Sequence, residues 1–288
     1  MNESRPPGRL LPLRLLGYAG DMDKISVALG GGGAAGYGHI VVLEALDELG
    51  IKPVALAGTS MGALIAVAYG AGISAKDLRA HLLDMVESPM KPARRLWNGY
   101  LSTGLNVLRP VNALAAVETV LPDEVPEDLS NLAIPTTVVA TDYFDRCEVS
   151  FTSGATRPRV AASLSIPGLF DPAEIDGRYY VDGGVTNNLP FEVLPEGTIR
   201  LAVDVASEPP EEVVDPPGSL AVTMGSMRIM MRALLEARLE NTPPEILIEP
   251  EPCKFGALDF LSAAEILEAA EPAREATKRA VENALKAD

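Results

Sequence analysis

One serine, Ser60, stands between two glycines in the pentapeptide Gly58-Thr59-Ser60-Met61-Gly62. An apolar run over 54–57 leads into it, and a helix-forming apolar run over 63–69 follows. The pattern predicts a buried strand that turns sharply into a helix, with the serine at the apex of the turn. Glycine suits both sides because a side chain would clash where the strand and the helix pack together. A serine presented beside the N–H groups of a helix N-terminus can act as a nucleophile; the alternative is an ordinary strand-to-helix turn.

A nucleophile of this kind needs hydrogen-bond donors for the oxyanion that it creates. Four consecutive glycines, Gly30–Gly33, follow a short apolar run over 24–29 and precede a helix predicted over 36–49. Successive glycines let neighbouring N–H groups face one point with no side chain in the way. The same run matches a dinucleotide fingerprint at Gly31, Gly33 and Gly36, but that fingerprint requires an acidic residue where Ser60 and its neighbours stand. We therefore interpret the glycines as oxyanion donors.

The residue that takes the proton from the serine is harder to find. The chain has only two histidines, His39 and His81, and neither follows a strand late in the chain, where α/β-hydrolases place their histidine. Three aspartates stand at the ends of predicted strands: Asp142, Asp182 and Asp204. Asp182 is favoured because Gly183 and Gly184 follow it and allow another loop to approach closely. The other two aspartates remain open at this point.

The elements that must position these residues alternate between strand and helix patterns. Strands are predicted over 24–29, 54–59, 136–142, 148–152, 173–175, 178–181, 199–204 and 245–248. Helices are predicted over 36–49, 63–70, 75–86, 219–240 and 262–285. Asp176-Gly177 is a two-residue hairpin signal between two of the short strands. This alternation predicts a mainly parallel sheet between layers of helices.

Composition narrows the function classes. The chain has 288 residues, is 47% hydrophobic and carries a formal net charge of −16, which argues against nucleic acid and against electrostatic docking on anionic membranes. Its two cysteines form no motif and fit a reducing compartment, so we expect a cytoplasmic protein. We expect a loosely ordered tail over 1–22 and one domain over 23–288. A second interpretation of the basic, amphipathic tail is a peripheral membrane contact.

Two segments allow more than one interpretation. Residues 88–104 combine prolines and arginines with Trp97 and are predicted to be a surface connection; the alternative is a flap or a lipid-facing patch. In the helix predicted over 219–240, a methionine-rich stripe recurs at helical spacing: Leu220, Met224, Met227, Met231 and Leu234. We expect this stripe to fill the core. The alternative is an adaptable wall of an acyl-chain groove.

Three motifs in fixed order carry a family resemblance: Gly31-Gly32-Gly33-Ala34-Ala35-Gly36, Gly58-Thr59-Ser60-Met61-Gly62 and Asp182-Gly183-Gly184. Together they resemble the bacterial type of the patatin-like phospholipase family. Further blocks at 141–142, 163–170 and 187–190 resemble that family as well. The resemblance implies a three-layer α/β/α fold and a Ser–Asp dyad, with Ser60 as nucleophile and Asp182 as base. It also implies an oxyanion hole from the backbone of Gly31, Gly32 and Gly33, with motif support from Gly36, Gly58, Gly62, Gly183 and Gly184.

The resemblance implies a serine hydrolase of lipid esters, of the phospholipase A or lysophospholipase type, with no cofactor and no metal. One departure is Ala35, where the family usually has arginine or lysine, so headgroup preference and rate are open. The alternatives are a short-chain carboxylesterase or thioesterase and, in another class, a catalytically weak lipid-binding protein. The sequence leaves the oligomeric state open.

Overall fold

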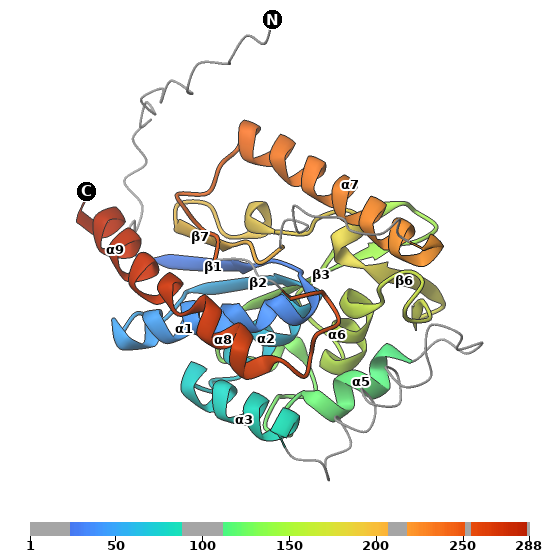
Figure 1. Cartoon of the computed structure of the whole chain (residues 1–288), viewed down its shortest axis with the longest axis horizontal. Coiled ribbons are helices and arrows are strands. Elements are labelled where there is room, and N and C mark those ends of the chain that lie inside the picture. Colours follow the sequence, from blue (N-terminus) through green and yellow to red (C-terminus); the bar gives the residue numbers. More distant parts are fainter. Residues whose placement is uncertain (1–23, 88–111, 207–217, 251–254, 287–288) are drawn as a thin grey trace, which may run out of the picture.

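A sheet of eight strands forms the middle layer of the described part of the chain (Figure 1). The computed structural model describes residues 24–87, 112–206, 218–250 and 255–286. The tail over 1–22 and Trp97 with its segment lie outside these ranges. The strands are β1 (Ile25–Leu29), β2 (Ala55–Thr59), β3 (Thr136–Asp142), β4 (Cys147–Phe151), β5 (Ala173–Ile175), β6 (Arg178–Asp182), β7 (Ile199–Val203) and β8 (Ile246–Ile248). Their order is β5-β6-β3-β2-β1-β7-β8, with β4 paired to β3.

Helices cover both faces of this sheet. They are α1 (Gly38–Glu48), α2 (Met61–Gly70), α3 (Ala75–Glu87), α5 (Ala113–Val120), α6 (Thr156–Leu164), α7 (Ser219–Asn241), α8 (Ala263–Ala270) and α9 (Pro272–Lys286). Figure 1 shows α1, α2, α8 and α9 on one face and α7 on the other. The strands from β8 through β7, β1 and β2 to β3 are parallel, so the predicted three-layer, mainly parallel α/β/α fold is confirmed. Within the described ranges, no helix has the length and apolarity needed to cross a bilayer.

The two faces of the sheet have cores of different size. In β1, Val27 and Leu29 belong to the large cluster beneath α1 and α2, whereas Ala28 belongs to a small cluster on the α7 side. The small cluster also takes Ala57 from β2 and Leu235 from α7. Alternate residues of a strand point to opposite faces, so large side chains fill one side while alanines leave room for close packing on the other.

The register of β3 brings two distant segments together. Because β4 pairs with β3 along 138–142 on one side, β2 and β6 must both pair with its other side. Thr59 of β2 lies opposite Val139, and Asp182 of β6 lies opposite Ala140, the next residue along. The parallel strand β2 and the antiparallel strand β6 therefore end facing each other.

Helix α7 is less buried than the sequence analysis predicted. Its bounds agree with the sequence pattern, but Met224, Met227 and Met231 are only half-buried and Leu234 is 47% exposed. Leu235, one position beyond the stripe, is the residue of α7 that joins the core. The core-filling interpretation was wrong because periodicity identifies the inward face of a helix but not how much of that face is covered.

A cluster of charges fastens α1 to the helices around it. Glu44 of α1 is buried and accepts two hydrogen bonds from Arg79 of α3, each 2.7 Å long. Arg274 of α9 also donates to Glu44, and both arginines bind Glu271, next to α8. This cluster holds α1, the helix that follows the glycine loop, at its outer end.

Glu44→Ala is expected to lower the free energy of unfolding by about 2–3 kcal/mol, because it removes the buried carboxylate that two partly buried arginines share and leaves them only the more exposed Glu271 in common. Urea denaturation followed by circular dichroism measures this. The control Glu282→Ala removes an exposed partner of Lys286 and is expected to cost less than about 0.5 kcal/mol. Equal losses in the two variants would contradict the structural role of Glu44.

Candidate active site

Ser60 occupies a strained turn between β2 and α2. Its φ of 53° and ψ of −125° lie in a region that residues other than glycine rarely adopt, at a cost of about 1–3 kcal/mol. The two glycines of the motif permit close contact: a Cβ at position 62 would lie 2.1 Å from the carbonyl oxygen of Leu29, and one at position 58 would lie 2.5 Å from that of Gly62. This is the predicted strand–serine–helix turn.

Ser163, at the end of α6, holds this turn in place. The backbone N–H of Ser60 donates to Oγ of Ser163 over 2.8 Å, and Ser163 donates to the carbonyl of Val139 over 2.5 Å. Ser163 is completely buried, so the bonds are not exchanged for bonds to water. Two residues later, the carbonyl of Ser165 accepts the N–H of Asp182 over 2.9 Å. One helix end therefore fixes the backbone of both predicted catalytic residues, a role that the sequence analysis did not find.

Asp182 is a buried carboxylate at the end of β6. Oδ1 accepts the N–H of Gly184 over 2.7 Å, and Oδ2 has no hydrogen bond of standard geometry. Burial raises the pKa of Asp182 to about 6, while the Ser60 hydroxyl and the Gly184 N–H act against the rise. A Cβ at Gly183 would lie 3.1 Å from Cγ2 of Thr59, the residue before the serine. The structure thus brings Ser60 and Asp182 together.

The glycine loop after β1 offers fewer donors than the sequence predicted. The N–H of Gly31 donates to the carbonyl of Asn188 over 2.9 Å, which removes it from the predicted oxyanion hole. The N–H groups of Gly32 and Gly33 donate to no acceptor in the described ranges. Gly33 has a φ of 60°, a conformation that glycine adopts without strain. Gly32 and Gly33 remain the candidate donors.

Two buried side chains hold the orientation of this loop. Nε2 of His39 hydrogen-bonds the carbonyl of Gly30 over 2.7 Å, and Nδ2 of Asn188 donates to the carbonyl of Gly31 over 3.1 Å. In a trans peptide the N–H points opposite to the carbonyl, so fixing the Gly31 carbonyl turns the N–H of Gly32 away from Asn188. Asn188 follows the Asp182 loop in the chain, and it therefore links the base side of the site to the donor side. In the sequence analysis Asn188 belonged to a family block and had no assigned role.

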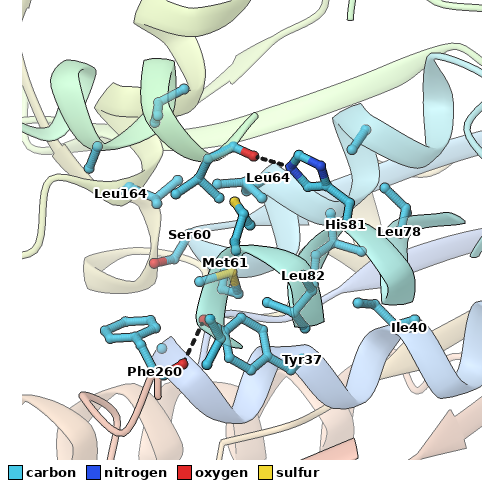
Figure 2. Close-up of a pocket in the computed structure, with 18 of the residues that line it drawn as sticks. Tyr37, Ile40, Ser60, Met61, Leu64, Leu78, His81, Leu82, Leu164 and Phe260 are labelled. Atoms are coloured by element: carbon cyan, nitrogen blue, oxygen red, sulfur yellow. Dashed lines mark hydrogen bonds between the residues drawn. The ribbon is translucent and has the colours of Figure 1, made fainter. Parts of the chain in front are cut away.

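The other candidate bases have structural partners. His39 is completely buried with its Nε2 engaged, and burial lowers its pKa to about 4. Nε2 of His81 lies 2.9 Å from the carbonyl of Val120, toward which its ring turns in Figure 2. Asp142 accepts the N–H groups of Phe144 and Asp145 and binds Arg178. Asp204 binds Arg232 and accepts the N–H of Ala206. The described residues contain no cluster of three potential metal ligands.

An apolar pocket leads away from Ser60. Figure 2 shows Ser60 at one end, with Met61 and Leu64 of α2 beside it and Leu78 and His81 of α3 farther along. Other lining side chains are almost all aliphatic or aromatic, among them Ile65, Leu82, Met85, Val117, Phe170 and Phe260. Such a lining accepts a hydrocarbon group and offers few polar partners.

Comparison with known proteins agrees with this site. The family described as patatin-like phospholipase matches residues 27–195, more than half of the chain and all three motifs. The chain belongs to the patatin-like phospholipase family. Members of this family are lipid acyl hydrolases, which agrees with a serine beside an apolar pocket.

Several relatives share this patatin-like domain. An uncharacterized NTE family protein of Mycobacterium tuberculosis is 35% identical over 183 residues, which are 64% of this chain and 49% of the relative. Patatin-like phospholipase domain-containing protein 7 of Rattus norvegicus is 29% identical over 70% of this chain and 15% of its own length. The chain thus spans about half the length of the mycobacterial relative. The crystal structure of VipD from Legionella pneumophila superimposes with a TM-score of 0.48 at 15% identity, over 90% of this chain and 67% of VipD.

Asn188→Ala is expected to reduce kcat for a soluble ester by about tenfold to a hundredfold with little change in KM, because the Gly32 N–H loses its fixed direction. Steady-state kinetics measure the effect. The matched control is Asn187→Ala, since Asn187 is equally buried but its amide binds Glu148 and Glu192. Full activity in the Asn188 variant, or an equal loss in the control, would contradict this role.

Proposed function

We propose that this protein hydrolyses carboxylic esters of lipids through an acyl-enzyme on Ser60, with Asp182 as general base. The observation that carries the proposal is the meeting of a strained serine, a buried carboxylate that interacts with its hydroxyl, and an apolar pocket. Strain of this kind persists where a side chain must be presented for chemistry. A pKa of about 6 suits a base that works near neutral pH.

In the first half of the reaction, Oγ of Ser60 attacks the ester carbonyl carbon while Oδ2 of Asp182 takes the hydroxyl proton. The carbonyl oxygen becomes an oxyanion, which the N–H groups of Gly32 and Gly33 stabilise. When the C–O bond to the alcohol breaks, Asp182 returns the proton to the leaving oxygen. In the second half, water attacks the acyl-Ser60 carbonyl, Asp182 takes and returns a proton, and the free acid leaves with Ser60 restored.

The pocket supports an acyl chain as the group next to the scissile bond. Ala35, at the position where the family usually has a basic residue, is 3% exposed and packs in the main core, so no cation reaches the substrate from there. Hydrolysis rates over esters with acyl chains from about two to sixteen carbons, with and without a phosphate headgroup, separate a lipid hydrolase from a short-chain esterase. Rates that rise with chain length support the proposal, and a maximum at the shortest chain favours the esterase.

A fluorophosphonate is expected to add once to the wild-type chain and not at all to Ser60→Ala, because the reagent requires an activated serine. Intact mass spectrometry counts the adducts, and peptide mapping locates them between Gly58 and Gly62. A folded wild-type protein that stays unlabelled would favour the lipid-binding alternative. Stoichiometric labelling that survives in Ser60→Ala would refute Ser60 as nucleophile.

Asp182→Asn is expected to lower kcat by about 10³-fold, as the loss of a catalytic base does elsewhere. In the wild type, kcat/KM is expected to rise with pH and level off above about 6, because the carboxylate must be deprotonated to accept a proton. A pH–rate profile of wild type and variant measures both.

A stability measurement distinguishes the loss of kcat in Asp182→Asn from a loss of activity through unfolding. Burial raises the pKa of Asp182, so the folded state binds its proton more tightly than the unfolded state, and the charged carboxylate destabilises the fold above pH 6. At pH 8 the Asp182→Asn variant is therefore expected to be at least as stable as the wild type. Asp204→Asn, at another buried strand end, is the matched control and is expected to lose much less activity. An active Asp182→Asn variant would end the dyad hypothesis.

A further inference from the structure

Three exposed aromatic side chains form a cluster at one end of the sheet: Tyr143, Phe144 and Tyr179, here called the aromatic crown. Their exposed fractions are 58%, 69% and 41%. The rings of Tyr143 and Phe144 meet edge to face with centroids 5.3 Å apart, and those of Phe144 and Tyr179 with centroids 6.1 Å apart. Large apolar side chains gathered in this way on a surface indicate an interaction site.

The aromatic crown lies at the edge of the sheet where Ser60 and Asp182 meet. Asp182 pairs with Ala140 of β3, and the chain continues past that level into Tyr143 and Phe144. At about 3.3 Å per residue, the crown projects on the order of 10 Å beyond the catalytic pair. A surface that docked on the crown would therefore lie over the opening of the site.

The turn that carries the crown is held rigidly. Oδ1 of Asp142 accepts the N–H groups of Phe144 and Asp145, and Arg178 of β6 binds both aspartates. The N–H of Tyr143 donates to the carbonyl of Tyr179 over 3.0 Å, which joins the two hairpins. The rings are exposed on a fixed scaffold and lose little conformational freedom when they are buried by a partner.

A groove lies beside the crown. Its lining residues include Tyr143 and Phe144 of the crown together with Phe170 and Val185. Val185 follows the Asp182 loop in the chain, and Phe170 also lines the apolar pocket that begins at Ser60. Phe170 therefore connects the groove beside the crown to the lining of the proposed acyl site.

The size of the aromatic crown and the charges around it indicate which kind of partner docks on it. Three side chains on a hairpin tip offer far less than the roughly 800 Å² per partner of a stable protein–protein interface. Tyrosine and phenylalanine suit the headgroup level of a bilayer, where one end of the ring is apolar and the other wet. Near the crown, exposed acidic side chains outnumber basic ones, with Asp145, Asp171, Glu174 and Asp176 against Arg146 and Arg178. The chain also carries a net charge of −16, which disfavours anionic lipid.

We propose that the aromatic crown docks the protein on zwitterionic lipid surfaces and places the mouth of the active site against them. This inference extends the proposed function and rests on it, because docking on a lipid surface serves an enzyme that hydrolyses lipid esters. Docking itself does not require turnover, so binding and hydrolysis are measured separately. Failure of one is then distinguishable from failure of the other.

The experiment uses the full chain with Ser60→Ala, which leaves the vesicles intact, and sedimentation with phosphatidylcholine vesicles. Adding Tyr143→Ser and Phe144→Ser is expected to weaken vesicle binding at least tenfold, roughly the effect of withdrawing one aromatic side chain from an apolar phase. The same two substitutions in the otherwise wild-type chain are expected to leave hydrolysis of a water-soluble ester intact. Vesicles containing phosphatidylglycerol are expected to bind the parent more weakly at low salt.

The matched control changes Ile229→Ser and Met230→Ser on α7, whose exposed fractions of 69% and 60% equal those of the crown pair closely. It is expected to bind vesicles like the parent. No binding of the parent to phosphatidylcholine, or an equal loss in the α7 control, would overturn the proposal. A dimer in light scattering that disappears with the crown substitutions would also overturn it and would assign the crown to a second copy of the chain.

Discussion

The site depends on two strands that share one side of β3. β2 runs parallel to β3 and stops at Thr59, and β6 runs antiparallel to it and stops at Asp182, one residue farther along. Neither strand can extend without colliding with the other, so the chain must leave the sheet at both points. The glycines at 62 and 183 permit this, since a Cβ at either position would lie within 2.3 Å of a backbone oxygen. The serine and the carboxylate meet because the sheet has room for only one strand there.

This meeting has an energetic cost that the rest of the fold must offset. Ser60 holds a strained backbone and Asp182 buries a carboxylate oxygen without a standard hydrogen bond. Each is unfavourable by itself. Ser163 and Ser165 bond to the backbone of these two residues from one helix end, and α6 in turn packs on β3. The large core beneath α1 and α2 stabilises the fold as a whole. A folded protein retains strain at a site when the rest of the fold offsets its cost in this way.

Local features of the fold were predictable from the sequence. The strands at 25–29 and 136–142, the turn at Ser60 and the hairpin at Asp176 and Gly177 all follow from apolar runs and turn residues within a few positions. The bond between Asn188 and Gly31 joins positions 157 apart, and no local pattern encodes it. The loss of Gly31 as a donor follows from a second bond between the same two residues, from the Gly31 N–H to the Asn188 carbonyl, and no local pattern encodes that bond either. The burial of the methionine-rich stripe on α7 was predicted wrongly for a related reason, because helical spacing does not show whether another element packs against the stripe.

The buried polar side chains of the site act on the backbone more than on a substrate. Ser163 fixes the N–H of Ser60, His39 fixes the carbonyl of Gly30, and Asn188 fixes the carbonyl of Gly31. In the proposed dyad the base is an aspartate, which becomes neutral when it accepts the proton and so lacks the positive charge with which a protonated histidine stabilises a neighbouring oxyanion. More of the barrier must then be lowered by donors that already point at the oxyanion, and peptide N–H groups do so only when their planes cannot rotate. The proposed dyad therefore requires a rigid glycine loop, and His39 and Asn188 supply that rigidity.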